Sequence, residues 1–506
     1  MYRNPVLYGD FSDPDVVRVG DDFYMVASSF TYLPGVPLLH SKDLVHWEII
    51  NHCVSRLPFE KYDRPSHGSG TWAPSIRFHE GMFYVFVPLV DEGILVARSA
   101  DPYGEFELNM ICSSKGWIDS CPFWDDDGRA YMVFAFARSR CGIKHRLALV
   151  EMDPLCNRLI GEPRVIFDGE QVAPTTEGPK MYKYNGFYYI LMPSGGVATG
   201  WQSALRARCI EGPYEYRVVM HQGCTDVNGP HQGGWVDTLD GKHWFVHFQD
   251  VIELGRIIHV QPMCFVNDWP FIGSDLDGDG IGEPVKEWSL PVENQPAYEI
   301  AQSDWFDGER LGLQWQWQAN PREEFYSLKG HEGIRLYCLC NEGRENLLWY
   351  GANVMTQIPQ HQAFSVVAKV RLEGREMGDM ASLGMVGHTY GYLGLKMTDE
   401  GPGLALYTGK VLNKEFEGEA VETLAAFCPY EGDRVFLRME LFKEKRYQFS
   451  WSSDGIRYHL IGEPVVLERA TWTGAKLCLW ACNRENVSSE GYGEFEFVEI
   501  EDRSYC

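Results

Sequence analysis

One pattern recurs five times in the first part of this 506-residue chain, and it constrains the fold more than any other feature. Each copy is a turn that contains Gly or Asp, followed by an aromatic-rich run typical of a strand. The copies begin at Gly20, Gly81, Gly128, Gly186 and Gly241. Repeats of roughly 50 residues built from several short strands are typical of β-propellers. The sequence therefore predicts an all-β chain whose residues 1–290 form a five-bladed propeller.

The residue pattern of the sequence changes after Leu290. The stretch 291–300 has the mixed polarity of a linker, and the segment LPVENQPAYEI contains two prolines. Beyond it, polar and apolar residues alternate in runs such as FSVVAKV, and polar turns such as Ser-Asp-Gly separate them. Alternation of this kind is typical of half-buried strands. We predict one β-sandwich over residues 301–506.

A distinctive residue precedes each repeated turn by a similar number of positions: Asp13, Trp72, Asp119, Glu177 and His231. Innermost propeller strands surround the central channel, so equal phase in each blade predicts that these side chains converge on one funnel. Three of the five are carboxylic acids, and clustered carboxylates repel one another and resist ionisation. A structural role needs at most one such acid. The pattern favours a catalytic cluster over a structural or binding role.

Composition excludes several other classes of function. The formal net charge of −26 repels phosphate backbones, so we expect no nucleic-acid partner. No apolar signal region opens the sequence, and no later segment is long and apolar enough to cross a membrane. The 14 cysteines lack metal-binding spacing, and together with the two preceding observations this predicts a cytoplasmic protein with free thiols. A homo-oligomer is compatible with the sequence, which does not decide the oligomeric state.

Several segments carry a resemblance to a known family. They are FSDPDVVRVGDDFYMVASSF, GTWAPSIRFHEGMFYVF, DSCPFWDDDGRAYMVFAF, TEGPKMYKYNGFYYIL, NGPHQGGWVDT and LGRIIHVQPM, in this order. The sequence resembles glycoside hydrolase family 43, in the branch of β-xylosidases and α-L-arabinofuranosidases. The segments LGLQWQWQANP, SSDGIRY and TWTGAK resemble the concanavalin-like or jelly-roll-like β-sandwich appended to many of these enzymes.

The resemblance implies a role for each of five residues. Asp13 would be the general base, and Glu177 would be the general acid. Asp119 would orient Glu177 and tune its pKa. Trp72 would form part of the pocket wall, and Arg256 would bind sugar hydroxyls. One departure from the family pattern is Asp-Ser-Cys-Pro-Phe, where Asp-Pro-Ser-Leu-Phe is more usual, so the backbone after Asp119 is open to a different course.

Two further expectations follow from the resemblance. His231 would lie in the channel, where many relatives hold one calcium ion mainly through water, although a satisfied core histidine is an equally good interpretation. Trp472 would lie on a loop that the sandwich sends over the funnel, or it is an ordinary strand aromatic.

The acidic run Asp275–Gly280 begins like a calcium loop. Its twelfth position is Lys286, however, which favours a surface turn.

The sequence thus predicts an exo-acting, inverting glycosidase that releases terminal β-D-xylose or α-L-arabinofuranose from oligosaccharides derived from xylan or arabinan. Inversion needs the two carboxyl groups to be roughly 6.5–9.5 Å apart. Two alternatives stay open, namely a non-catalytic carbohydrate-binding propeller and an endo-arabinanase. The sequence does not separate xylose from arabinofuranose, because the two pentoses offer similar hydroxyls.

Overall fold

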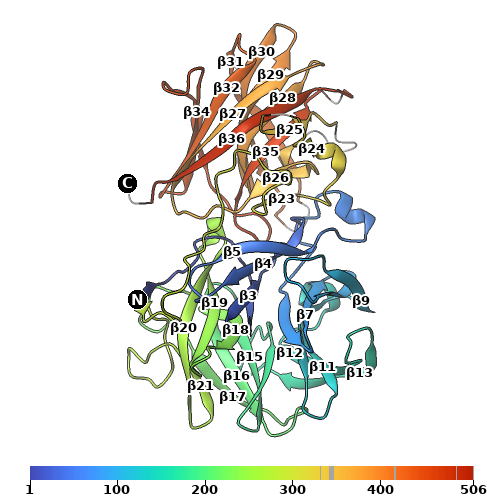
Figure 1. Cartoon of the computed structure of the whole chain (residues 1–506), viewed down its shortest axis with the longest axis vertical. Helices are drawn as coiled ribbons and strands as arrows, with labels where there is room; N and C mark the ends of the chain where they lie inside the picture. Colours follow the sequence, from blue (N-terminus) through green and yellow to red (C-terminus); the bar gives the residue numbers. More distant parts are fainter. Residues whose placement is uncertain (331, 341–346, 415–417, 486, 505–506) are drawn as a thin grey trace.

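The two halves of the chain fold as two β-domains stacked end to end, as the computed structural model in Figure 1 shows. The structure describes residues 1–330, 332–340, 347–414, 418–485 and 487–504. The lower domain in this view is a propeller and the upper domain is a sandwich. This arrangement confirms the predicted fold class.

Five four-stranded antiparallel sheets form the blades of the propeller within the described residues. Blade 1 contains β2 (Asp15–Val19), β3 (Asp22–Val26), β4 (Gly35–Ser41) and β5 (Glu48–Val54). Blade 2 contains β6 (Ser75–His79), β7 (Met82–Leu89), β8 (Gly93–Ser99) and β9 (Glu107–Ser113). Blade 3 contains β10 (Trp117–Trp124), β11 (Ala130–Phe136), β12 (Arg146–Met152) and β13 (Leu159–Asp168). Blade 4 contains β14 (Lys180–Tyr184), β15 (Phe187–Ser194), β16 (Trp201–Ala207) and β17 (Glu215–Met220). Blade 5 contains β18 (His231–Asp237), β19 (His243–Asp250), β20 (Arg256–Val266) and β21 (Trp269–Ile272).

The repeated glycines lie in the turn between the first and second strands of their blades. All five have φ between 64° and 82°, the left-handed region that glycine enters without steric cost. The aromatic run after each glycine is the second strand of its blade, and this strand is buried because blades stack on both of its faces. The sequence repeat therefore marks the inner hairpin of every blade.

Hydrophobic cores lie between neighbouring blades and close the ring. The core between blades 5 and 1 includes Phe11, Val16, Trp244 and Ile258, all of them buried. Asn4 reinforces this junction, because its side chain exchanges hydrogen bonds with the backbone of Val260 at 2.8 and 2.9 Å. Strands β1 (Tyr2–Arg3) and β22 (Glu287–Trp288) pair nearby.

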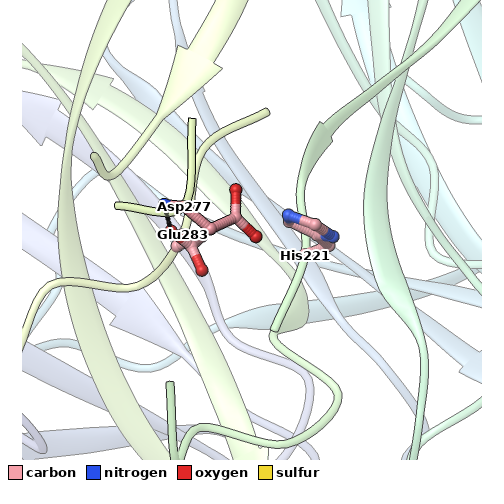
Figure 2. A group of neighbouring side chains, drawn as sticks. All are labelled: His221, Asp277 and Glu283. Atoms are coloured by element: carbon pink, nitrogen blue, oxygen red, sulfur yellow. Dashed lines mark hydrogen bonds between the residues drawn. The ribbon is translucent and has the colours of Figure 1, made fainter. Parts of the chain in front are cut away.

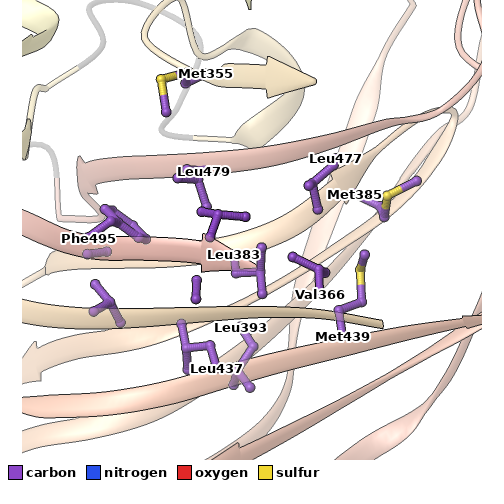
Figure 3. Close-up of a cluster of buried hydrophobic side chains, with 14 of the residues drawn as sticks. Met355, Val366, Leu383, Met385, Leu393, Leu437, Met439, Leu477, Leu479 and Phe495 are labelled. Carbon is purple, nitrogen blue, oxygen red and sulfur yellow. The ribbon is translucent and has the colours of Figure 1, made fainter. Parts of the chain in front are cut away.

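Two seven-stranded sheets form the sandwich within the described residues. The first runs in the order β23 (Trp315–Trp317), β26 (Met355–Gln357), β35 (Lys476–Asn483), β28 (Asp379–Val386), β29 (Thr389–Thr398), β30 (Gly401–Val411) and β31 (Ala420–Pro429). The second runs in the order β24 (Tyr326–Ser327), β25 (Ile334–Tyr337), β36 (Tyr492–Asp502), β27 (Phe364–Glu373), β32 (Arg434–Phe442), β33 (Arg446–Ser452) and β34 (His459–Val466). Inward-facing side chains such as Val366, Leu383 and Leu437 fill the space between the sheets (Figure 3).

Helices are few and short in the described part of the chain: α1 (Arg138–Cys141), η1 (Glu60–Asp63), η2 (Ile252–Leu254), η3 (Glu323–Phe325) and η4 (Leu348–Tyr350). None of them has the length and apolar character that a bilayer crossing demands. Residues 291–300 form no strand. The exact limits 1–290, 291–300 and 301–506 stay predictions.

The two domains share a polar and apolar interface. Leu33 of the propeller and Trp317 of the sandwich form a β-bridge, with N–H···O distances of 2.6 and 2.8 Å. Leu254, in the turn before β20, packs into the hydrophobic core of the sandwich. The interface therefore lies against the end of the propeller where β20 begins.

Candidate active site

Each innermost strand begins with an unusual backbone conformation. A left-handed residue lies within two positions of the start of this strand in every blade: Asp13 (φ 56°), Ala73 (φ 20°), Asp119 (φ 57°), Gly178 (φ 55°) and Gln232 (φ 55°). Non-glycine residues with positive φ are uncommon and concentrate at functional sites. Each of these positions is either a predicted site residue or directly follows one. The equal phase seen in the sequence therefore corresponds to a shared backbone turn at one end of the channel.

Asp13 is buried, and both of its carboxylate oxygens accept hydrogen bonds. Arg256, the first residue of β20, donates from Nη1 to Oδ1 at 2.8 Å. Ser28 donates from Oγ to Oδ2 at 2.7 Å. Two donors from two different blades fix the orientation of this carboxylate. The bond from the arginine is charge-assisted, which makes it stronger than a hydrogen bond between neutral groups.

Asp119 and Glu177 are the other two carboxylic acids of the site. The backbone N–H of Gly178, next to Glu177, donates to Oδ2 of Asp119 at 2.7 Å. Burial raises the pKa of Asp119, and the charge of Asp13 adds to this increase against the opposing Gly178 hydrogen bond. Burial is also the largest cause that raises the pKa of Glu177, followed by the charges of Asp119 and Asp13. Glu177 is thus suited to hold a proton near neutral pH.

Trp72 and Trp472 meet although they belong to different domains. Their rings lie edge to face, with centroids 6.1 Å apart. Trp472 has φ of 66° and lies in the loop between β34 and β35, with 44% of its surface exposed. It is therefore a loop residue rather than a strand aromatic. Trp72 precedes β6, the innermost strand of blade 2, so the sandwich loop reaches the channel end that carries the acids.

His231 is buried at the start of β18. Nδ1 lies 2.7 Å from the carbonyl oxygen of Gly229, so we assign the ring proton to this nitrogen. Nε2 is buried without a hydrogen-bond partner in the described residues. Burial lowers the pKa of His231 to about 4, which leaves the ring neutral and the Nε2 lone pair available. The geometry therefore fits a single nitrogen ligand to an ion or to ordered water.

The acidic run near residue 275 lies apart from these residues. Figure 2 shows the imidazole of His221 facing the carboxylates of Asp277 and Glu283. Glu283 is fully buried, and its oxygens accept hydrogen bonds from the backbone N–H groups of Cys224, Leu276 and Asp277. These bonds hold the loop in shape, and they agree with the interpretation of the run as a turn.

Two residues of the site gave no signal in the sequence. Ser28 contacts Asp13 across a separation of 15 residues, and Asp10 accepts a hydrogen bond from the Arg256 backbone at 3.0 Å. Serine and aspartate are common in loops, so neither type alone indicates a role. In the sequence, only the Leu-Gly-Arg context and its resemblance to the family indicate a role for Arg256.

Paired carboxylic acids of this kind break glycosidic bonds, because one protonates the leaving oxygen and the other activates water. The fold and the site define the protein as a glycoside hydrolase. Residues 2–270 match the sequence profile of glycosyl hydrolases family 43, and residues 303–501 match the β-xylosidase C-terminal concanavalin A-like domain. The chain belongs to glycosyl hydrolase family 43, which confirms the resemblance found in the sequence.

Individual relatives carry related names. A putative beta-xylosidase from Xylanibacter ruminicola is 35% identical over 94% of this chain and 86% of the relative. A non-reducing end alpha-L-arabinofuranosidase from Bacteroides ovatus is 32% identical over 66% of this chain and 64% of the relative. The solved structure of a bifunctional GH43-CE protein from Bacteroides eggerthii has a TM-score of 0.85 at 27% identity, covering 99% of this chain and 64% of that one. The xylan beta-1,4-xylosidase of Bacillus halodurans C-125 shares the fold, with a TM-score of 0.85 at 22% identity over 99% of this chain and 100% of that one.

Proposed function

We propose that this enzyme releases single terminal pentoses, β-D-xylose or α-L-arabinofuranose, from oligosaccharides derived from xylan or arabinan, with inversion at the anomeric carbon. The observation that carries the proposal is the contact between Trp472 of the sandwich and Trp72, which precedes the innermost strand of blade 2. A loop from a second domain at this position closes one end of a cleft. Such a closed pocket favours a chain end over an internal bond.

The proposed mechanism divides the work between two sides of the channel. Glu177 protonates the leaving oxygen, because its raised pKa retains the proton that this step needs. Asp13, paired with Arg256, takes a proton from the water that attacks the anomeric carbon. Asp119 stays close to Glu177 and supplies part of the negative charge that raises its pKa. No covalent intermediate forms, so the product anomer is inverted.

Unpaired donors in the site support a hydroxyl-rich ligand. Nε1 of Trp72 and Nε of Arg256 are buried and have no hydrogen-bond partner in the described residues. A buried donor without a partner costs about 1–3 kcal/mol, and a bound sugar hydroxyl would remove that cost. This feature also fits a purely carbohydrate-binding propeller. The raised pKa of Glu177 instead favours catalysis.

The test compares aryl β-D-xyloside with aryl α-L-arabinofuranoside and then follows the products from linear and branched oligosaccharides. We expect release of one pentose per event from the non-reducing end. Random internal cleavage of arabinan would support the endo-arabinanase alternative, and binding without turnover would support the carbohydrate-binding alternative. Proton NMR during turnover checks inversion, because early appearance of the retained anomer contradicts the role given to Asp13.

We also propose that His231 Nε2 faces a calcium ion that takes most of its ligands from water. Calcium prefers six to eight oxygen ligands, so one imidazole supplies only a minor part of such a site. In the described residues, the two groups of metal-capable side chains are His221–Asp277–Glu283 and Asp275–Asp277–Asp279, which do not include His231. Elemental analysis of the purified protein, and its melting temperature with and without chelator, would test the proposal against the variant His231→Ala.

A further inference from the structure

Asp10 is a buried carboxylate that lies where three segments meet, and the chemistry proposed above does not use it. Only 4% of its surface is exposed. Oδ1 accepts hydrogen bonds from Ser12 Oγ at 2.9 Å and from the backbone N–H of Arg256 at 3.0 Å. Oδ2 accepts a hydrogen bond from the backbone N–H of Gly474 at 2.9 Å. One side chain thus joins the Asp13 loop, the start of β20 and the sandwich loop that carries Trp472.

The backbone around Asp10 is packed too tightly for other side chains. A Cβ atom at Gly255 would lie 2.2 Å from Oδ1 of Asp10, and one at Gly474 would lie 2.3 Å from the Leu254 backbone. The N–H of Ala475 donates to the Glu253 carbonyl at 2.8 Å, which fixes the same two loops to each other. Both glycines therefore permit a close approach that brings the Gly474 N–H to the Asp10 carboxylate.

Cations from both domains accompany this carboxylate. Arg256 contributes from the propeller; burial opposes its charge, but the carboxylates of Asp13, Asp250 and Asp10 together raise its pKa. Lys476, the first residue of β35, contributes from the sandwich and is itself buried, with Nζ 4.6 Å from the centroid of the Tyr32 ring. Burial lowers the pKa of Lys476 to about 8, and Asp10 is the acid that opposes this decrease. A buried charge needs such partners to remain in a protein interior.

Two short chains of contacts leave Asp10 toward the site. One runs through the backbone of Arg256 to its guanidinium and then to Oδ1 of Asp13. The other runs through Gly474 to Trp472, two residues earlier, and then to Trp72. The first chain holds the carboxylate that activates water. The second holds the aromatic ring that the sandwich places at the pocket.

We propose that Asp10 is a positioning residue that couples the sandwich loop bearing Trp472 to the Arg256–Asp13 pair, so that the pocket wall and the base are set together. This inference rests on the proposed function, because it assumes that Asp13 and Trp472 act on a bound pentoside. It assigns Asp10 no contact with substrate. Its effect on turnover passes through Arg256, and its effect on binding passes through Trp472.

The test uses two substitutions in the full chain. Asp10→Asn keeps one oxygen acceptor for the Arg256 N–H but turns an NH₂ group toward the Gly474 N–H, so the loop contact is lost. We expect this variant to raise KM on aryl pentosides by up to about 100-fold, the loss that a 1 Å misplacement can cause. Asp10→Ala removes both contacts and should also lower kcat. Asp10→Asn in the Trp472→Ala background should raise KM much less, because the tryptophan ring that the loop contact positions is already absent.

Asn320→Ala is the matched control. Asn320 is a buried interdomain residue whose side chain makes three hydrogen bonds to the propeller, two with Leu57 and one with Asp63, none of which involves Asp10. It should lower the melting temperature while the kinetic constants of the folded enzyme stay unchanged. Asp10→Asn kinetics equal to wild type would overturn the proposal. An undiminished KM effect in the Trp472→Ala background would also overturn it.

Hydrogen exchange supplies a readout that does not depend on activity. The Gly474 amide should exchange faster in Asp10→Asn than in wild type, and it should remain protected in Asn320→Ala. Equal exchange in wild type and Asp10→Asn would show that Asp10 does not hold the loop. If the wild type hydrolysed neither aryl pentoside, the proposed function would fail, whereas the exchange result would still judge the contact between Asp10 and the loop.

Discussion

Asp13 and Asp119 adopt the same left-handed conformation, although they lie on different blades. A non-glycine residue in this region costs on the order of 1–3 kcal/mol, so the surrounding contacts must enforce it. Asp119, in blade 3, lies at a bulge, because the pairing of β10 with β11 shifts register between Ile118 and Cys121. Bulges redirect side chains. In four of the five blades the left-handed residue at this position is not a glycine, so the propeller maintains this turn at a cost in local conformation.

The acid and the base should respond differently to substitution. Removal of a general acid or base typically costs about 10²–10⁴-fold in rate. Asp13→Ala should lose activity on every substrate, because each one needs an activated water. Glu177→Gln should lose less on nitrophenyl glycosides, whose leaving groups need little protonation. Steady-state rates on nitrophenyl and unactivated substrates check both expectations, and near wild-type rates on natural oligosaccharides would contradict the assignment.

Asp119 should set the alkaline limit of activity. Burial contributes most to the raised pKa of Glu177, and the negative charge of Asp119 is the next cause. Asp119→Asn removes that charge, so the pKa of Glu177 should fall toward its ordinary value. Glu177 then loses its proton at lower pH, and the alkaline limb of the kcat/KM profile should move to lower pH. An unshifted limb, measured over the same buffers, would show that Asp119 does not tune the acid.

At the scale of elements, local patterns predicted the architecture well and the domain contacts poorly. The turn glycines and the aromatic strands after them recur because each inner hairpin meets the same steric requirements. Such requirements act within a few residues, so a sequence displays them directly. The contact of Gly474 with Asp10 joins residues 464 positions apart, and no local preference encodes it. The resemblance to a family supplied Arg256 and suggested Trp472, whereas Asp10 and Ser28 emerged only from the folded chain.

The Trp472 loop should affect substrate handling without supporting the fold. Trp472 is 44% exposed and is not part of the hydrophobic core of the sandwich, so truncation leaves that core intact. Trp472→Ala should raise KM or lower kcat on short substrates, because a ring that confines the sugar and excludes water is lost. Circular dichroism and the melting temperature should stay close to wild type. Trp305→Ala, which truncates another exposed tryptophan of the sandwich, serves as control. Equal kinetics in both variants would show that the loop only supports the propeller.

At the scale of the whole molecule, the sandwich completes the functional end of the propeller as well as extending the chain. Leu254 lies in the sandwich core, and the next residues of that turn lead directly to Arg256. A change in domain packing therefore reaches the site through two residues of backbone.

The large negative charge is a separate property of the whole surface. Expectations drawn from it and from the cysteines, namely no nucleic-acid partner and a cytoplasmic location, stay predictions.

The acid cluster should make the stability of the whole molecule depend on pH. The folded-state pKa of Glu177 is raised above its ordinary value of 4.5, so the folded enzyme holds a proton that the unfolded chain releases. The corresponding stability is fully present below pH 4.5 and is lost as pH rises through the raised folded pKa, by up to about 1.4 kcal/mol per pH unit. The amide introduced by Glu177→Gln does not titrate, so this variant lacks that contribution. Its melting temperature should therefore fall less than that of wild type between pH 5 and pH 8. The difference in unfolding free energy between the two proteins should change by up to about 1.4 kcal/mol per pH unit. Scanning calorimetry at both pH values measures the difference, and Glu309→Gln, at an exposed acid, is the control. Parallel melting curves for Glu177→Gln and wild type would mean that Glu177 is ionised in the folded enzyme, and it could then not serve as the general acid.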